Sequence, residues 1–183
     1  MGAFIVANIQ AVFIDRDGTI GGTGHFMHPK DFTPYNFSVE ALQLLKKSNL
    51  PIYACTNQYR ISRGEATIDD FRREFAHMEF DDAFICPHRS TAGCDCHKPA
   101  PGLFLQAARK YQIDLTKTVV IGDVGSTDMI AAHKIGAKKV LVKTGWGKSS
   151  LTDYLHTWQD VQPDYVADHV LDAAHWVLKN KYE

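Results

Sequence analysis

Two carboxylates, separated by one residue, are the first candidates for chemistry. The segment 15–19 reads DRDGT and follows a short apolar run at residues 10–14. Residues two apart in an extended chain project to the same side, so Asp15 and Asp17 can face one site as the chain turns at Gly18. A divalent cation between them would relieve their repulsion and keep Asp15 ionised as a nucleophile, leaving Asp17 to donate and accept protons. An ordinary polar turn is the competing interpretation.

Two further polar positions have the chemistry to bind phosphate. Thr56 follows the apolar run IYAC, and its hydroxyl can bind a phosphate oxygen together with the backbone amides that come after it. Lys98 lies in a segment stiffened by Pro99 and Pro101, and its ammonium can neutralise a phosphate and a neighbouring carboxylate. Taken alone, an ordinary turn and a solvated lysine explain these two positions.

A second acidic pair lies in the run GDVGSTD, residues 122–128. Asp123 comes at the end of an apolar run and Asp128 in the first turn of the helical pattern that follows. Such carboxylates are the hard oxygen ligands that Mg²⁺ prefers. Alternatively, Asp123 caps the helix and Asp128 complements its dipole. Both acids together, opposite Asp15, favour a metal site.

The rest of the chain supplies the elements that position these residues. Short apolar runs predict strands at 10–14, 52–56, 83–86, 119–122, 139–142 and 165–167. Helical patterns lie between these strands. The first is capped by Ser38 and ends near Asn49, the second has a capping box from Thr67 to Asp70, and the third holds Pro101 in its first turn. A fourth covers 129–135 and is stopped by Gly136, and two more lie around the last strand. This alternation predicts an α/β fold with a parallel sheet covered on both faces, whose ligands bind beyond the carboxyl ends of the strands.

Length and composition narrow the class of protein. The 183 residues fit one domain, spanning 1–183, with 45% apolar and 22% charged residues. The net charge of −1 leaves no basic excess for binding nucleic acid. Apolar runs are too short to span a bilayer, and the N-terminal segment lacks the features of a signal peptide. We therefore expect a cytoplasmic monomer whose partner is a small metabolite, with no nucleic acid or membrane.

In their order along the chain, these motifs resemble those of the haloacid dehalogenase (HAD) superfamily of phosphatases. The matching positions are DRDGT at 15–19, Thr56, Lys98 and the acidic pair Asp123 and Asp128. The resemblance implies a HAD-like, Rossmann-like fold of three layers around a central parallel sheet. The intervals between the motifs leave no room for a separate cap domain, so we expect a site open to water.

The same resemblance implies a role for each residue. Asp15 would be the nucleophile and Asp17 the general acid and base, while Thr56 and Lys98 would bind the phosphate. Magnesium would be held by Asp15, Asp123 and the backbone carbonyl of Asp17. Asp128 would either lie next to these ligands without binding the ion directly, or pair with Lys98.

A cluster of soft ligands lies just before the lysine, in the segment 86–96. Cys86, His88, Cys94 and Cys96 form a Cys₃His set that suits tetrahedral Zn²⁺, although one-residue gaps are tighter than the usual two-residue knuckle. All four zinc positions would then be filled by protein, which predicts a structural ion. Three free thiols and a surface histidine are the alternative. We call this segment the zinc loop.

The sequence CPHRSTAGCDCHKPAPG is similar to the zinc loop of the heptose bisphosphate phosphatases and the related histidinol-phosphatase domains, where the loop helps to form the substrate site. This chain departs from them at His97, where they typically have arginine, and at Tyr59 and Arg60, where they tend to read Ser-Gly. We expect Asn57, Arg60, Arg63 and His97 to contact substrate, the last three as a site for a second anionic group. Ordinary surface charge explains those three equally well.

Together these features predict a Mg²⁺-dependent phosphomonoester hydrolase that forms an aspartyl-phosphate. Its substrate would be a small metabolite of the sugar bisphosphate or histidinol-phosphate type. The alternative from another class is a non-catalytic phospho-aspartate receiver or a degenerate binding module, since receivers also place paired acids and a lysine at the strand ends of a similar sheet. The DGT sequence and the zinc loop count against it. A polynucleotide end-phosphatase is disfavoured by the near-neutral charge.

Overall fold

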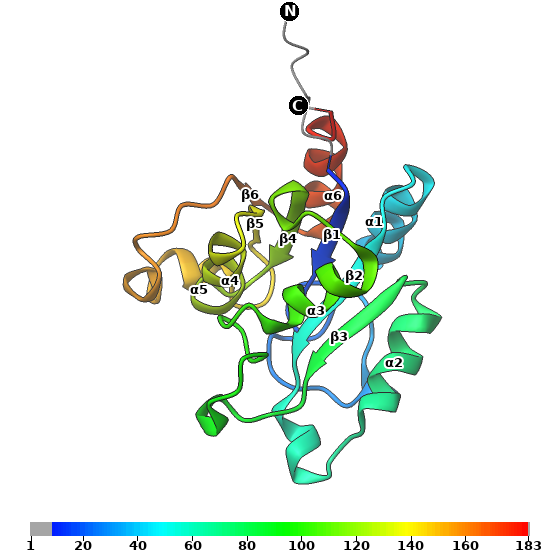
Figure 1. The fold of residues 1–183 in the computed structure, drawn as a ribbon, viewed down its shortest axis with the longest axis vertical. Coiled ribbons are helices and arrows are strands. Elements are labelled where there is room, and N and C mark those ends of the chain that lie inside the picture. The colour runs from blue at the N-terminus through cyan, green and yellow to red at the C-terminus, as the bar shows by residue number, and fades with distance from the viewer. Residues whose placement is uncertain (1–8, 183) are drawn as a thin grey trace, which may run out of the picture.

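Six parallel strands form the centre of the molecule in the computed structural model, which describes residues 9–182 (Figure 1). Their order in the sheet is β3-β2-β1-β4-β5-β6. The strands are β1 (Ala11–Ile14), β2 (Ile52–Asn57), β3 (Asp82–Cys86), β4 (Thr118–Gly122), β5 (Lys138–Val142) and β6 (Tyr165–Ala167). Every predicted strand is confirmed to within one residue at either end.

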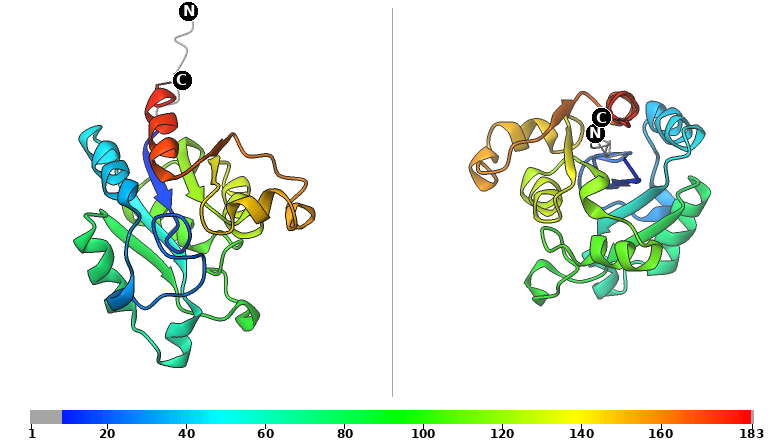
Figure 2. Two further views of the ribbon diagram at one scale, coloured as in Figure 1. Left: turned by 180° about the vertical axis from the view of Figure 1, so that it is seen from behind. Right: turned by 45° about the horizontal axis from the view of Figure 1, so that its top comes forward.

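Helices cover both faces of this sheet, which gives three layers (Figure 2). Helices α1 (Asn36–Lys47), α2 (Ile68–His77) and α6 (Val170–Lys179) pack on one face. Helices α3 (Gly102–Tyr111) and α4 (Ile130–Lys134) pack on the other, and α5 (Gly147–Leu151) lies beyond the end of β5. The predicted α/β, Rossmann-like architecture is confirmed. Within residues 9–182, no element forms a separate cap domain, and no helix is long and apolar enough to cross a membrane.

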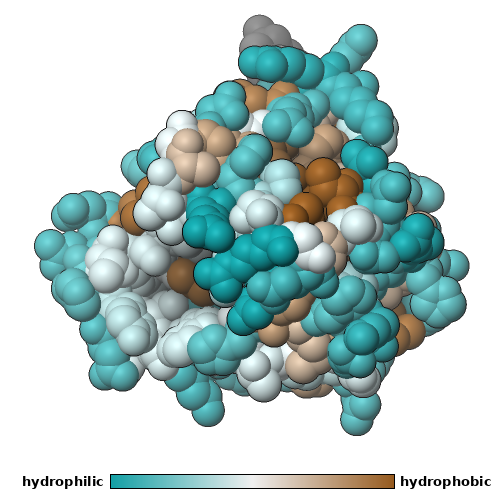
Figure 3. Space-filling view, turned by 90° about the horizontal axis from the view of Figure 1, so that it is seen from below, coloured by the Kyte–Doolittle hydropathy of each residue, from teal (hydrophilic) through white to brown (hydrophobic). Residues whose placement is uncertain are grey.

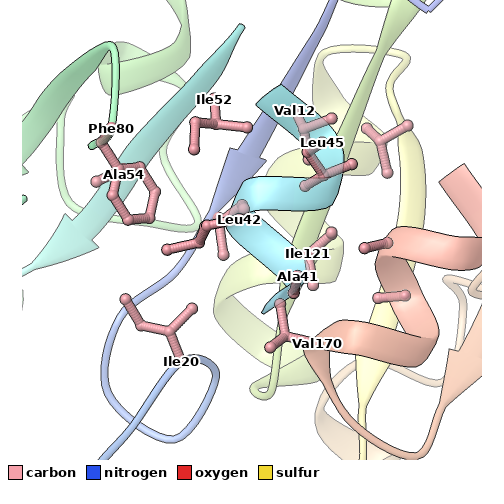
Figure 4. Close-up of a cluster of buried hydrophobic side chains, with 14 of the residues drawn as sticks. Val12, Ile20, Ala41, Leu42, Leu45, Ile52, Ala54, Phe80, Ile121 and Val170 are labelled. Atoms are coloured by element: carbon pink, nitrogen blue, oxygen red, sulfur yellow. The ribbon is translucent and has the colours of Figure 1, made fainter. Parts of the chain in front are cut away.

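The apolar character of β1 follows from its place between β2 and β4. Successive strand residues point to opposite faces, so Val12 and Ile14 join the core under α1 and α6, while Ala11 and Phe13 join the core under α3. All four are fully buried. Figure 4 shows Val12 in the first of these clusters. The packed strand fixes the position of the residue that follows it, Asp15.

Two predicted helix ends agree with the structure and a third does not. The capping box between Thr67 and Asp70 is present in both directions, and Gly136 adopts the expected left-handed conformation after α4. The cap predicted at Ser38 is wrong: α1 begins at Asn36, and Ser38 lies buried in its first turn with no partner for its hydroxyl. The reason is tertiary, because Tyr35 is tethered by hydrogen bonds to the segment after β1 and starts the helix early.

The carboxyl ends of the strands all meet at one edge of the sheet, because the strands are parallel. Seen from below in Figure 3, this end of the molecule carries hydrophilic side chains near its centre. The segment 18–35 leaves β1 there and returns to α1 across it. We call this segment the flap.

Candidate active site

A buried lysine connects two of the predicted acids. The Lys98 Nζ lies 2.9 Å from Asp15 Oδ1 and 2.6 Å from Asp128 Oδ1, and it donates to the carbonyl oxygen of Cys55 at 2.7 Å. Its side chain is only 3% exposed. Burial disfavours the ammonium, but the carboxylates of Asp128 and Asp15 outweigh burial and raise the pKa of Lys98. The lysine is therefore a fixed cation at the end of β1.

A third carboxylate, that of Asp123, lies close to the two that contact this cation. Oxygen atoms of Asp15, Asp123 and Asp128 lie within 4.8 Å of one another. Burial is the largest cause that raises the pKa of Asp123 well above its usual value and that of Asp128 to about 6, and the charge of Asp15 raises both further. One lysine does not neutralise three acids, so the set fits a hard divalent cation such as Mg²⁺. Asp15 and Asp123 are the predicted ligands in this set.

The surrounding backbone fixes the two predicted magnesium ligands. The Asp15 amide donates to the Ile121 carbonyl across the sheet at 2.9 Å. Asp123 Oδ2 accepts the Trp146 amide at 2.7 Å. Asp123 does not cap its own helix, whereas Asp128 Oδ2 does accept the Val124 amide at 3.1 Å. The carboxylate of Asp123 is therefore not used as the helix cap that the alternative assigned to it, and the amide at the helix start is bound by Asp128 instead.

The Asp17 carboxylate is held on both of its oxygen atoms. Oδ1 accepts from the Arg16 guanidinium at 2.7 Å and Oδ2 accepts from Gln58 Nε2 at 2.6 Å. Burial raises its pKa to about 6, against the lowering effect of Arg16 and with a smaller raising effect of Asp15. A carboxyl group with this pKa can exchange a proton near neutral pH.

Gln58 is a site residue that the sequence analysis missed. Its amide also donates to Thr56 Oγ1 at 3.0 Å, so it bridges Thr56 and Asp17. Both Thr56 and Gln58 are 1% exposed. The signal was available in the sequence, because Gln58 lies two residues after Thr56 and so projects to the same side.

Asn57 makes contacts that were not predicted. Its side-chain amide donates to the Lys98 carbonyl, and its Oδ1 accepts the Lys98 amide, both at 3.0 Å. The two hydrogen bonds attach the segment carrying Lys98 to the end of β2. Asn57 therefore positions the lysine. It also lines the cavity described below, so its assignment as a substrate contact stays a prediction.

These side chains open into a cavity of about 170 Å³. Asp15, Asp17, Thr56, Lys98 and Asp128 line its floor, and Gly24, Phe26 and Tyr59 contribute to its walls. The structure thus places the predicted nucleophile, the acid and base, and the phosphate ligands around one small polar space. That space suits a phosphate group bound at the end of β1.

A second hollow of about 350 Å³ lies beyond Tyr59, which lines both spaces. Its lining residues are Tyr59, Arg63, Arg89, Ser90, Thr91 and His97. Two of the three predicted anion ligands, Arg63 and His97, meet here. Arg60 does not line this hollow and pairs with Glu65 at 2.6 Å, and Arg63 lies 3.8 Å from the other oxygen of that carboxylate. Arg89 was not predicted, although a basic residue inside the zinc loop was a usable signal.

The four predicted zinc ligands lie together. The Cys86 Sγ is 3.3 Å from Cys96 Sγ and 3.8 Å from Cys94 Sγ, and the His88 Nδ1 is 3.2 Å from Cys96 Sγ. Ligands on a tetrahedral zinc ion, with Zn–S bonds of about 2.3 Å, lie about 3.8 Å apart. The donor set and its spacing therefore fit Zn²⁺. His97 lies against the same cluster, with Nδ1 3.8 Å from Cys86 Sγ.

Comparisons with known proteins agree with this geometry. Residues 95–173 match the family model described as HAD-hydrolase-like. The D-glycero-beta-D-manno-heptose-1,7-bisphosphate 7-phosphatase of Vibrio cholerae is 33% identical, over 93% of this chain and 97% of the relative. The protein of that name from Photorhabdus laumondii is 38% identical over 75% of this chain and 82% of its own.

A solved structure is similar over nearly its whole length. The D,D-heptose 1,7-bisphosphate phosphatase from B. bronchiseptica, complexed with magnesium and phosphate, superposes with a TM-score of 0.78 and 28% identity. The alignment covers 92% of this chain and 98% of that one.

Proposed function

The chain belongs to the haloacid dehalogenase superfamily of phosphatases, and from this premise we propose that it hydrolyses a sugar bisphosphate with Asp15 as its nucleophile. The chain is thus a phosphomonoester hydrolase that acts on a small phosphorylated metabolite. The observation that carries the assignment of Asp15 is its contact with Lys98 in a cavity of about 170 Å³, which has room for a phosphate group. The non-catalytic alternative is not supported, since the relatives that cover most of the chain are named as phosphatases.

In the first step, an Asp15 carboxylate oxygen attacks phosphorus in line with the leaving group. The bond between phosphorus and the leaving oxygen breaks, and Asp17 gives its proton to that oxygen. Lys98 and Thr56 bind the equatorial oxygens of the transferring group, and the positive charge of Lys98 offsets the negative charge there. The products are the free alcohol and phosphorylated Asp15.

Mg²⁺ would be held by Asp15, Asp123 and the backbone carbonyl of Asp17. Asp128 would not bind the ion directly and would pair with Lys98. When bound, the ion supplies positive charge that keeps Asp15 ionised and neutralises the phosphate. The fit is supported by the three buried acids with oxygens within 4.8 Å and one lysine among them.

In the second step, Asp17 takes a proton from a water molecule. The water oxygen attacks phosphorus, the bond to the Asp15 oxygen breaks, and orthophosphate leaves. Asp17 returns to its protonated form, ready for the next substrate. A carboxyl with a pKa of about 6 suits both directions of this transfer.

The second hollow is our candidate site for the other phosphate of the substrate. Arg63 and Arg89 offer two cations, and His97 adds a ring nitrogen, in a hollow that shares Tyr59 with the first cavity. This arrangement favours a substrate with two anionic groups over a monophosphate. The relatives are named as phosphatases of a heptose bisphosphate, which carries two phosphate groups, and this agrees with that choice.

Zn²⁺ in the zinc loop has a structural role in this proposal, because the Cys₃His set leaves no open position for substrate. The loop leads directly into Lys98, so an ordered loop helps to place the lysine. The monomeric state and the cytoplasmic location expected from the sequence remain predictions.

Phosphate release from a panel of sugar monophosphates and bisphosphates, with and without Mg²⁺, tests the proposal. We expect Mg²⁺-dependent turnover that is fastest with a bisphosphate, and no turnover by Asp15→Asn. Stable phosphorylation of Asp15 without turnover of any substrate would instead identify a receiver. Activity of Asp15→Asn in a clean preparation would refute the nucleophile assignment.

A further inference from the structure

A buried arginine connects the Asp17 carboxylate to a helix outside the cavity. The Arg16 side chain is fully buried. Its Nε and NH2 donate to the two carboxylate oxygens of Glu74 on α2, each at 2.7 Å, and its NH1 donates to Asp17 at 2.7 Å. One guanidinium group therefore joins two carboxylates through three charge-assisted hydrogen bonds, which are the strong kind.

Aromatic rings hold the plane of this guanidinium. The Arg16 Cζ lies 3.8 Å from the ring centre of Phe32, in the flap, and 4.9 Å from that of Phe71 on α2. Phe71 and Glu74 are three residues apart in α2 and so share one face of the helix. Helix α2 thus supplies both a ring against the plane and a carboxylate at the edge.

The geometry determines where Arg16 points. A guanidinium group is planar and rigid, so pairing of its Nε–NH2 edge with Glu74 sets the direction of NH1. NH1 is the atom that holds Asp17 Oδ1, while Gln58 holds the other oxygen. Glu74 itself does not line the catalytic cavity. Its hydrogen-bonded connection to the site runs through Arg16, and its negative charge also acts on Asp17 directly and raises the pKa of that carboxyl.

From these contacts we infer that Glu74 is a positioning residue that orients the Asp17 carboxyl for proton transfer to the leaving group, through Arg16. The inference rests on the proposed role of Asp17. A purely structural ion pair would also bury Arg16 and Glu74, but it would not need a third bond to the carboxyl group of the general acid. The two readings differ in how activity depends on the leaving group.

Leaving groups separate the two readings because kcat/KM reports the steps up to the first bond cleavage. Glycerol phosphate has an alkoxide leaving group that needs a proton from Asp17, whereas p-nitrophenyl phosphate releases a stable phenolate without one. We would measure kcat/KM with both substrates for Glu74→Gln and Glu74→Asp. In Glu74→Gln, the side-chain oxygen can still accept one hydrogen bond from Arg16, but the amide nitrogen faces the other N–H of Arg16. In Glu74→Asp, the negative charge is kept but the side chain is one methylene shorter.

Asp69→Asn is the matched control, because it removes one negative charge from the same helix at an exposed residue that pairs with the exposed Arg72. We expect it to retain the activity of the unaltered protein with both substrates. For the Glu74 variants we expect kcat/KM to fall about 10- to 100-fold with glycerol phosphate and less than about two-fold with p-nitrophenyl phosphate. Circular dichroism at the assay temperature checks that each variant is folded.

Asp17→Asn distinguishes the failure of this inference from that of the proposed function. If Asp17 is the acid, its variant must lose far more activity with glycerol phosphate than with p-nitrophenyl phosphate. Equal losses in that variant would overturn the role of Asp17 and the role of Glu74 with it. A substrate-dependent loss in Asp17→Asn, combined with equal or no losses in both folded Glu74 variants, would overturn the Glu74 inference alone.

Discussion

The Lys98 ammonium lies 2.9 Å from the Asp15 carboxylate, although 83 positions separate the two residues in the chain. The parallel sheet makes this contact possible, because it brings the end of β1 and the segment attached to the end of β2 to the same edge. Asp128 binds the other side of the ammonium at 2.6 Å. The lysine is therefore both a phosphate ligand in our proposal and a counter-charge for two buried acids.

Replacement of this lysine by Met should damage both activity and stability. Lys98→Met leaves Asp15 and Asp128 without their cation, and breaking a buried ion pair costs about 3–5 kcal/mol. We expect kcat to fall by about 100-fold or more and the midpoint of thermal unfolding in Mg²⁺-free buffer to drop. Lys110→Met, which loses an exposed pair with Asp82, is the control and should keep its activity. A fully active Lys98→Met protein would contradict the proposed site.

Mg²⁺ should stabilise the protein more at pH 7.5 than at pH 5. The pKa values of Asp17 and Asp128 are raised from 3.8 to about 6, and that of Asp123 is raised well above 3.8. In the Mg²⁺-free state the folded form therefore holds protons that the unfolded form has released, and its stability falls as pH rises from about 4 through 6. At pH 5, Mg²⁺ must displace those protons.

The measurement is the gain in unfolding midpoint on adding one fixed Mg²⁺ concentration, about 100 times the Kd at pH 7.5, at both pH values. At 100 times Kd the gain is about 2.7 kcal/mol, or roughly 5–10 °C for a domain of this size. Mg²⁺ should be removed by passage through buffer, not by a strong chelator, so that zinc is retained. Asp123→Asn should abolish the gain, and an equal gain at both pH values in the unaltered protein would count against the coupled acids.

The zinc loop should lose its metal when one soft ligand is removed. Cys86→Ser and Cys96→Ser replace buried thiols in the set, and we expect less than one zinc per chain by elemental analysis, with a lower unfolding midpoint. Cys55→Ala is the matched control, because Cys55 is a buried cysteine of β2 that does not belong to the set, so its variant should keep one zinc ion. The alternative of free thiols would be favoured if the unaltered protein were purified without zinc and if Cys96→Ser had the same unfolding midpoint as the unaltered protein.

Removing a cation from the second hollow should weaken the binding of bisphosphates selectively. Arg89→Gln and Arg63→Gln remove one cation each from its lining. We expect KM for a sugar bisphosphate to rise about 10-fold, the usual scale of one charge-assisted contact, with kcat/KM for p-nitrophenyl phosphate unchanged. Arg72→Gln alters an exposed arginine outside the hollow and controls for the change in net charge. Equal effects on both substrates would argue against a second phosphate site.

The strands and the acid pairs were predictable because their signals are local. Runs of apolar residues at β1 and β4 reflect burial on both faces of a parallel sheet. The acids Asp15 and Asp123 follow those runs directly, so the position of each strand places the acid. The capping box at Thr67 is equally local, and it too is present.

The features that were missed depend on contacts between distant segments. The start of α1 is set by hydrogen bonds that Tyr35, at the end of the flap, makes to Ile20 and Gly22 near its beginning, and no pattern around Ser38 encodes them. Arg16 was treated only as a spacer in DRDGT, because its partner Glu74 lies 58 positions away. The pairing of Asn57 with the Lys98 backbone is of the same kind.

Gly18 should be irreplaceable for a reason that combines local and distant structure. Its φ of +83° is strained for any residue with a side chain. A Cβ atom at this position would lie 2.2 Å from Asp123 Oδ2 and 2.9 Å from the Cα of Gly145, so alanine must displace a proposed magnesium ligand. We expect Gly18→Ala to lose at least about 100-fold in kcat, since displacement of about 1 Å near the chemistry has that scale.

The matched control for this change is Gly64→Ala. Gly64 also has a positive φ, of +71°, but nothing lies within 4 Å of the position of its Cβ. Its variant should show the backbone strain as a lower unfolding midpoint while keeping Mg²⁺-dependent activity and the Mg²⁺-induced gain in midpoint. If Gly18→Ala lost no more activity than Gly64→Ala, the close packing of the DRDGT turn against Asp123 would have no part in catalysis. A selective loss in Gly18→Ala, with a weakened response to Mg²⁺, is what the contact with Asp123 requires.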